Sequence, residues 1–301
     1  MATTIRRRRV IIDTDAKNEA DDQYAIVHAL LSPTLDVRGI VPAHFGVERS
    51  TASMAESRTE VDLLLQLLGL GGQITVADGA AAAIPDPATP APSPGADLIV
   101  AESELASDDD PLFVAFLGPL TDMATAILTD PAIVDRPVVV VWIGGMGYDA
   151  DWNYPAVEFN LRNDIAAANV VFDSGITVWQ VPATVYSMVS VGYAELEERI
   201  GGTSTLADYL IEQLVEWNAA HHGEPIEHRS LGDSPAISLI LNPRGGVFRT
   251  IPAPRFSLEG GYLPGSGHPI RVCETVDVRY LLEDMFAKIR RFGRAQAAPT
   301  T

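Results

Sequence analysis

Residues 10–22 have the sequence VIIDTDAKNEADD, in which four aspartates and a glutamate follow a short apolar run. The apolar residues 10–12 indicate a buried parallel strand, and the helical spacing of apolar side chains in residues 22–30 predicts a helix packed against it. The acids therefore lie in a turn from strand to helix. In an open α/β sheet, such a turn is at the carboxyl end of the strands, where ligands bind.

Carboxylates crowded into one turn repel one another and raise each other's pKa, unless a cation lies among them. A hard divalent cation, Ca²⁺ or Mg²⁺, suits these oxygen ligands. We predict that Asp15 and Asp22 bind this cation, and that Asp13 and Asp21 support the site or contact a ligand. The alternative is that Asp21 caps the helix and its neighbours favour the helix dipole, which explains one or two acids but not five.

Composition limits the kind of protein this is. The 301 residues are 47% hydrophobic, and no linker separates two periodic halves, so we expect a single domain over residues 1–301 with a flexible tail from about residue 294. The net charge of −19 argues against nucleic acid or anionic membranes as partners. No apolar run approaches the ~20 residues needed to span a bilayer. No signal-peptide core follows arginines 6–9, so we expect a cytoplasmic protein.

Apolar runs rich in Val and Ile alternate with helical patterns along the chain. The expected strands are residues 10–12, 37–41, 74–77, 112–117, 138–143 and 176–181. The expected helices include residues 51–68, 165–172, 205–221, 236–241 and 276–292, with Gly- and Pro-rich loops over 242–267. This alternation predicts an α/β fold with a mostly parallel sheet and helices on both faces. It does not distinguish an open sheet from a closed one.

Three further segments carry polar groups at the ends of elements. Asp233 opens an apolar helix, where capping the helix is the alternative interpretation. Residues 153–160, NYPAVEFN, combine amides and a carboxylate with aromatic rings, which suits a sugar but also fits an ordinary polar loop. Residues 117–122, LGPLTD, end a strand with a Gly-Pro turn, which leaves a carbonyl free for a hard cation.

The order of these four segments resembles the inosine-uridine-preferring nucleoside hydrolase family, over residues 10 to about 241. The opening signature of that family is Asp-x-Asp-Pro-Gly-x-Asp-Asp. This chain has Asp13-Thr14-Asp15 and then Asp21-Asp22, with two extra residues and neither Pro nor Gly. The resemblance implies an open sheet and a calcium-dependent enzyme that hydrolyses ribonucleosides to ribose and free base, in purine or pyrimidine salvage. A homo-oligomer is compatible with it.

The resemblance also implies roles for individual residues. Calcium ligands would be Asp15, Asp22, Asp233 and the backbone carbonyl of Leu117, and Asp15 would also be the general base for the attacking water. Substrate contacts would come from Asp21, Asn18, Asn153, Glu158, Asn160 and His44. Among these, Asn153 is one residue out of register with the family pattern, and His44 lies near the place of an asparagine that this chain lacks.

One departure concerns the leaving base. The family histidine that precedes the late aspartate and helps to protonate the base is Gly232 here. Nearby His221, His222 and His228 are candidates to replace it, although an ordinary surface position is the better explanation for each of them.

Two other functions share parts of the pattern. A haloacid-dehalogenase-like phosphatase also has a strand ending in Asp-x-Asp, but it needs Thr or Val where Lys17 stands and a second aspartate near Ile237. A non-catalytic, metal-dependent nucleoside or sugar binding protein would keep the ribose site and lose the leaving-group acid.

Overall fold

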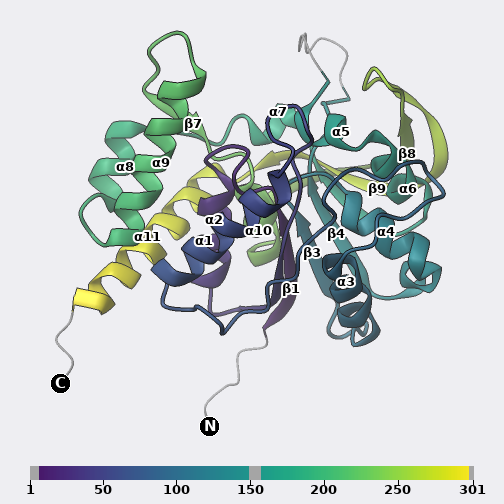
Figure 1. The fold of residues 1–301 in the computed structure, drawn as a ribbon, viewed down its shortest axis with the longest axis horizontal. Helices are drawn as coiled ribbons and strands as arrows, with labels where there is room; N and C mark the ends of the chain where they lie inside the picture. The colour runs from purple at the N-terminus through teal and green to yellow at the C-terminus, as the bar shows by residue number, and fades with distance from the viewer. Residues whose placement is uncertain (1–6, 149–156, 298–301) are drawn as a thin grey trace.

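The computed structural model describes residues 7–148 and 157–297, and its centre is a seven-stranded sheet (Figure 1). The strand order is β2-β1-β3-β4-β5-β9-β8. The bounds are β1 (Arg8–Thr14), β2 (Leu35–Pro42), β3 (Leu112–Phe116), β4 (Val138–Ile143), β5 (Thr177–Val181), β8 (Gly246–Phe256) and β9 (Tyr262–Val276). Neighbouring strands are parallel, except that β8 is antiparallel to β9. The predicted open, mostly parallel sheet is confirmed.

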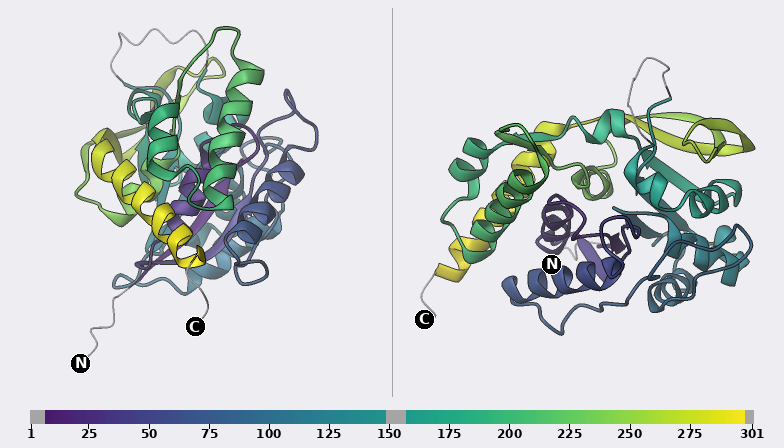
Figure 2. Two further views of the ribbon diagram at one scale, coloured as in Figure 1. Left: turned by 90° about the vertical axis from the view of Figure 1, so that its left-hand side faces the viewer. Right: turned by 45° about the horizontal axis from the view of Figure 1, so that its top comes forward.

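Helices cover both faces of the sheet, because successive strand residues point to opposite sides. In β1, Val10 and Ile12 belong to one hydrophobic core and Ile11 to the other. The first core is covered by α1 (Asp22–Leu30), α2 (Ser53–Leu67), α8 (Tyr193–Ile200), α9 (Thr205–His221), α10 (Ser234–Leu241) and α11 (Val278–Ala297). The second is covered by α3 (Pro94–Glu104), α4 (Thr121–Thr129), the 3-10 helix η1 (Pro131–Asp135) and α6 (Ile165–Asp173). In Figures 1 and 2, α8, α9 and α11 lie side by side.

Four short elements lie near the carboxyl end of the sheet. They are α5 (Phe159–Asn163), α7 (Ala183–Tyr186), and a separate antiparallel pair, β6 (Ser190–Gly192) with β7 (His228–Ser230).

The C-terminal part of the sheet was predicted wrongly. Residues 242–267 were expected to form loops, but they contribute β8 and the first residues of β9, which together form a long hairpin. The prolines that suggested a loop lie in this hairpin, where β8 is an edge strand and the pairing shifts register between Pro252 and Pro254. Proline is tolerated at such places because the ladder does not need its missing N–H.

Two boundaries also differ from the prediction. Residues 74–77 do not form a strand; they pair with β2 through the isolated bridge between Ile40 and Val76. Helix α11 was expected to end at residue 292 but continues to Ala297, through residues assigned to a tail. Its buried face extends to Gly293, which packs against the backbone of Thr203. No helix in the described part of the chain is long and apolar enough to cross a membrane.

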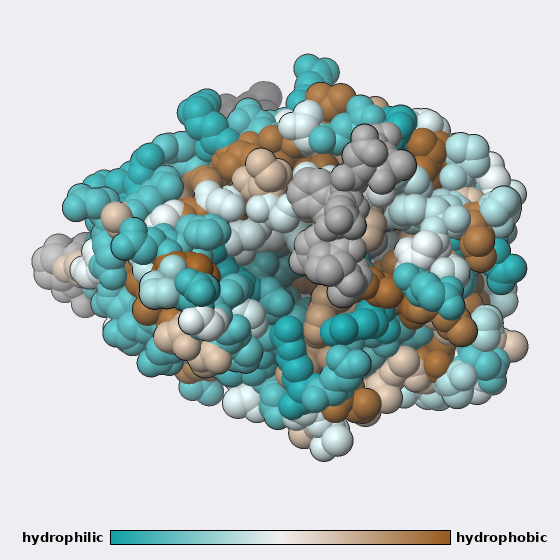
Figure 3. Space-filling view, turned by 90° about the horizontal axis from the view of Figure 1, so that it is seen from above, coloured by the Kyte–Doolittle hydropathy of each residue, from teal (hydrophilic) through white to brown (hydrophobic). Residues whose placement is uncertain are grey.

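The topology places a crevice at the carboxyl end of the sheet. Helix α1 follows β1 on one face, whereas α4 follows β3 on the other face, although β1 and β3 are neighbours. The chain therefore leaves these adjacent strands in opposite directions, and the crevice lies between them. Viewed from above, this end of the molecule is mostly hydrophilic and is hollowed near its centre (Figure 3).

Candidate active site

A pocket of about 360 Å³ lies at the carboxyl ends of β1, β3 and β4. Most of the residues predicted for the site line it: Asp15, Asn18, Asp21, Asp22, Leu117, Glu158, Asn160 and Asp233. They come from four segments that are far apart in the sequence, and the sheet topology brings them together.

Three acids of the pocket, Asp21, Asp22 and Asp233, lie at the N-termini of α1 and α10. Asp21 occupies the N-cap position of α1 and Asp233 that of α10, but neither side chain accepts a capping hydrogen bond. Asp21, Asp22 and Asp233 each direct a carboxylate oxygen to one place, and these three oxygens lie within 4.8 Å of one another. Capping therefore does not explain these acids, whereas binding of a metal ion does.

Ionisation is costly for these carboxyl groups. Burial raises the pKa of Asp15 and Asp233 well above the usual range, and neighbouring carboxylates raise it further. Burial also raises the pKa of Asp21 to about 7 and that of Asp22 to about 6, although Arg229 and the Thr14 hydroxyl partly offset the effect. A cation among them would restore the charged forms.

Unpartnered oxygens support the same interpretation. Oδ2 of Asp15 is buried and has no hydrogen-bond partner among the described residues, and the same holds for both carboxylate oxygens of Asp13. Asp13 is fully buried, and burial together with the charges of Asp122 and Asp15 raises its pKa well above the usual range. Buried polar atoms normally have partners, so Oδ2 of Asp15 fits a cation that completes its surroundings. Asp13 does not line the pocket, and its carboxyl group faces Asp122.

Glu158 is held rigidly at the start of α5. Its carboxylate accepts hydrogen bonds from the backbone N–H groups of Gly145 (2.7 Å), Leu161 (3.0 Å) and Asn160 (3.2 Å). The hydroxyl of Tyr186 donates a further bond to its Oε1 at 2.9 Å. These four donors fix the carboxylate at the edge of the pocket and fill its four acceptor sites, so it accepts from a sugar hydroxyl when the Tyr186 O–H turns away.

Asn160 ties two strand ends together. Its Nδ2 donates to the backbone carbonyls of Leu117 (2.6 Å) and Ile143 (2.8 Å), at the ends of β3 and β4. The carbonyl predicted to bind the metal thus already accepts one hydrogen bond, and its second lone pair is left for a cation.

His44 is the predicted residue that the structure places elsewhere. It is fully buried and is absent from the lining of the pocket. Its Nε2–H donates to Thr121, whose hydroxyl donates to Asp164, and its Nδ1 accepts from the N–H of Gly46. Burial lowers the pKa of His44 to about 4, so the ring is a neutral part of the core. The other exception, Asn153, lies outside the described residues.

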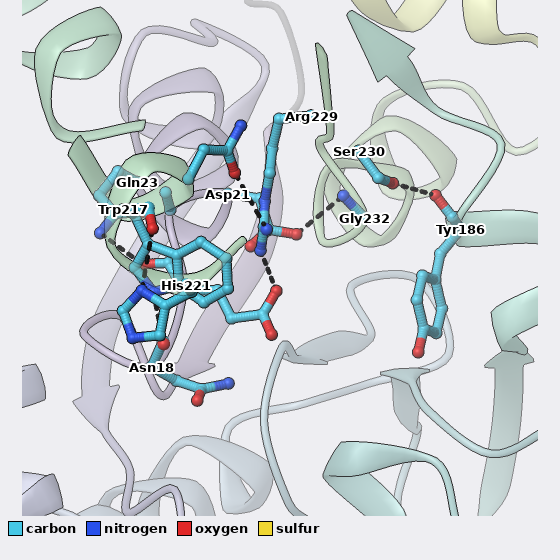
Figure 4. Close-up of polar contacts among 12 residues, drawn as sticks. Asn18, Asp21, Gln23, Tyr186, Trp217, His221, Arg229, Ser230 and Gly232 are labelled. Atoms are coloured by element: carbon cyan, nitrogen blue, oxygen red, sulfur yellow. Dashed lines mark hydrogen bonds and ion pairs between the residues drawn. The ribbon is translucent and has the colours of Figure 1, made fainter. Parts of the chain in front are cut away.

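A second cleft, of about 880 Å³, adjoins the acid pocket and shares Asp21, Glu158 and Tyr186 with it. Arg229 lies at this junction (Figure 4), where it forms an ion pair with Glu19 and stacks at 4.0 Å on the Trp217 ring. These two side chains cross-link α9, β7 and the acidic turn.

Arg49 also contacts the acidic turn. It donates to the backbone carbonyl of Asn18 at 2.9 Å and lies 4.5 Å from the centre of the Phe159 ring. The backbone carbonyl of Asn18 also accepts from the indole N–H of Trp217 at 3.0 Å. The side chains of Arg49 and Trp217, which are distant in sequence, therefore hold the lengthened turn in place.

Sequence reasoning missed Tyr186, Arg229 and Trp217. Trp217 has ordinary helical spacing within α9, and the other two belong to no recognisable motif, so no local signal distinguishes them. The nearby histidines do not replace the absent one: His221, His222 and His228 are described, and none lines the acid pocket. His221 instead stacks on Trp217, with ring centres 4.1 Å apart (Figure 4).

The fold and the site together define an α/β protein with a buried acidic pocket of the kind that holds a metal ion and with a rigidly held carboxylate beside it. The chain belongs to the inosine-uridine preferring nucleoside hydrolase family, whose sequence model matches residues 10–283. It is thus an N-glycosyl hydrolase that acts on ribonucleosides, and the predicted family and activity are confirmed.

Individual relatives are distant but cover most of the chain. The pyrimidine-specific ribonucleoside hydrolase RihA of Citrobacter koseri is 27% identical over 266 residues, which are 80% of this chain and 81% of the relative. RihA of Salmonella typhimurium is 26% identical over 261 residues, with the same two shares.

Solved structures share the fold. The purine-preferring ribonucleoside hydrolase of Gardnerella vaginalis has a TM-score of 0.78 at 20% identity, covering 96% of this chain and 100% of the relative. The plant nucleoside hydrolase PpNRh1 has a TM-score of 0.76 at 21% identity, covering 94% and 99%.

Proposed function

We propose that the chain is a calcium-dependent ribonucleoside hydrolase, in which the acid pocket binds both the ion and the ribose. The observation that carries this proposal is the convergence of Asp21, Asp22 and Asp233 beside the unpartnered Oδ2 of Asp15. Such a cluster of buried oxygens is a ligand set for a hard cation.

The ion would be held by Asp15, Asp22, Asp233 and the carbonyl of Leu117, and Asp21 lies close enough to contribute. Carboxylate and carbonyl oxygens without nitrogen or sulfur ligands favour Ca²⁺ over transition metals. When bound, Ca²⁺ supplies a water of lowered pKa and a fixed positive charge.

Asp15 is the proposed general base, which accepts a proton from the attacking water. Breaking the bond between C1′ and nitrogen leaves positive charge on the sugar, and the surrounding carboxylates stabilise that charge. Glu158, Asn160, Asn18 and Asp21 are the proposed ribose contacts. Of these, the Glu158 carboxylate is the most rigidly placed, since four donors hold it.

The leaving base would occupy the adjoining cleft. This cleft begins where the acid pocket ends and is lined by the ring of Phe159 and the guanidinium groups of Arg49 and Arg229. Aromatic and guanidinium surfaces stack on any nucleobase, so this lining gives binding without naming one base. The relatives also differ in base preference, since one is described as pyrimidine-specific and another as purine-preferring.

The test is release of base and ribose from a panel of ribonucleosides by purified protein, with Ca²⁺ and again after chelation. We expect calcium-dependent release, restored by adding Ca²⁺ back, and weaker activity on matched 2′-deoxyribonucleosides. Activity that survives chelation would contradict the role of the ion. Tight nucleoside binding without release would show a binding protein, and hydrolysis of 4-nitrophenyl phosphate instead would show a phosphatase.

A further inference from the structure

Cleavage of a ribonucleoside leaves an electron pair on the base, and most bases leave readily only if they receive a proton or a strong hydrogen bond. Among the described residues that line the acid pocket, none is a histidine. Its carboxyl groups are assigned to the ion or the ribose, apart from Glu19, which forms an ion pair with Arg229. Tyr186 carries the one hydroxyl group in that described lining. A phenol is protonated at neutral pH and can donate.

Tyr186 stands between the two halves of the site. It is the last residue of α7 and lines both the acid pocket and the adjoining cleft. Hydrogen bonds fix its backbone on both sides of the Cα atom. Its N–H donates to the carbonyl of Pro182 at 3.1 Å, and its own carbonyl accepts from the Ser230 hydroxyl at 2.9 Å. The ring points away from that bond, past Gly232 (Figure 4).

Gly232 makes room for this ring. A Cβ atom at position 232 would lie 3.0 Å from Cδ2 of Tyr186 and 3.2 Å from Oδ2 of Asp21, closer than side chains normally pack. The N–H of Gly232 also donates to that Asp21 oxygen at 2.9 Å, which fixes the backbone there. A larger side chain at 232 and the ring of Tyr186 therefore compete for one space, and in this chain the tyrosine occupies it.

We propose that Tyr186 is the catalytic acid that protonates the leaving base. This inference rests on the proposed hydrolase function. The C1′–N bond breaks with its electron pair moving to nitrogen, and the hydroxyl proton of Tyr186 passes to the base. Water supplies the new C1′–O bond and gives one proton to Asp15. Asp15 then releases that proton to solvent, and solvent returns a proton to Tyr186. The sum is nucleoside plus water to ribose plus base.

The hydroxyl of Tyr186 is already oriented for this task. It donates to Oε1 of Glu158, a proposed ribose contact, so it lies at the rim of the sugar site. A base bound in the adjoining cleft would accept this hydrogen bond in place of Glu158, since the O–H can rotate about its bond to the ring while the ring stays packed against Gly232.

Tyr186→Phe tests this proposal, because it removes the hydroxyl and keeps the ring against Gly232. The variant is compared with wild type on the best ribonucleoside and on 4-nitrophenyl β-ribofuranoside, whose phenolate leaves without a proton. We expect kcat on the ribonucleoside to fall by about 100-fold, the usual size of a general-acid contribution, and kcat on the nitrophenyl riboside to fall far less. Tyr209→Phe is the matched control, since it also removes a hydroxyl bound to a carboxylate, Glu60, outside the pocket.

Equal losses on both substrates would overturn the proposal, because they would mean that Tyr186 only positions Glu158 and the ribose. No loss on either would also overturn it. Failure of the proposed function looks different: wild type itself would then release no base from any ribonucleoside.

Discussion

At the scale of single residues, the site depends on backbone that leaves room for a crowded carboxylate. Gly118 is such a position, since a Cβ there would lie 3.0 to 3.1 Å from atoms of the Asp15 side chain. The backbone carbonyl of Asp15 accepts from the N–H of Asn18 at 2.8 Å, which closes the first part of the acidic turn. Asp15 is thus fixed in place while its Oδ2 stays without a partner among the described residues.

Asp15→Asn should lower kcat on ribonucleosides by about 100-fold or more, because the amide keeps the shape but cannot accept the proton of water. The metal-free variant should melt no lower than metal-free wild type at pH 7.5, since one buried charge is gone from a repelling cluster. Steady-state kinetics and calorimetry measure both. Asp62→Asn, on the exposed side of α2, is the control and should keep wild-type activity. Wild-type turnover in Asp15→Asn would refute its role as base.

At the scale of elements, a capping residue of α6 joins that helix to its neighbours. Asp164 is the N-cap of α6, where its carboxylate accepts from the N–H of Ala167, the N–H of Ile84 and the Thr121 hydroxyl, each at 2.8 Å. Through Thr121 this network also reaches His44. One buried carboxylate therefore joins α6, the start of α4 and the loop before α3.

Asp164→Ala should lower the free energy of unfolding by about 3 kcal/mol, which combines a lost cap with a buried N–H of Ile84 left unpaired. Ser204→Ala is the comparison, because Ser204 caps α9 through a single bond to Ala207 and its loss should cost only about 1 kcal/mol. Denaturant unfolding measures both values. Equal losses would show that the wider Asp164 network contributes nothing.

At the scale of the whole molecule, the acid cluster links stability to pH and to metal. In the metal-free protein the pKa values of Asp21 and Asp22 are raised from 3.8 to about 7 and about 6, mainly by burial. Groups with raised folded pKa values bind protons more tightly when folded. Their contribution is fully present below about pH 4 and is lost as pH rises through about 6 to 7.

The stabilisation by Ca²⁺ should therefore grow with pH. Without metal, these acids must either keep protons or repel one another, and the ion removes that cost once they ionise. We expect the rise in Tm on adding Ca²⁺ to be much larger at pH 7.5 than at pH 5, measured by calorimetry against chelated protein. A rise of the same size at both pH values would mean that the ion binds elsewhere.

Local sequence predicted those elements in which buried apolar residues recur at a regular spacing. The strand at residues 138–143 and the helix at 205–221 have the bounds expected of them, because apolar periodicity records burial directly. The acidic turn was also predictable, since five acids after one strand have few purely structural explanations. The β8–β9 hairpin was not, because its prolines are tolerated only through edge position and a register shift, which depend on neighbouring strands.

The sequence by itself determined the α/β fold and the family, and it predicted the residues that we propose bind a hard cation, because each depends on patterns within one segment or on their order. The tertiary structure alone decided which of these residues meet. It placed His44 in the core, brought Gly232 within hydrogen-bond distance of Asp21 across 211 residues, and set the Tyr186 ring against that glycine. Such contacts join segments whose separation in sequence carries no information about their distance in space.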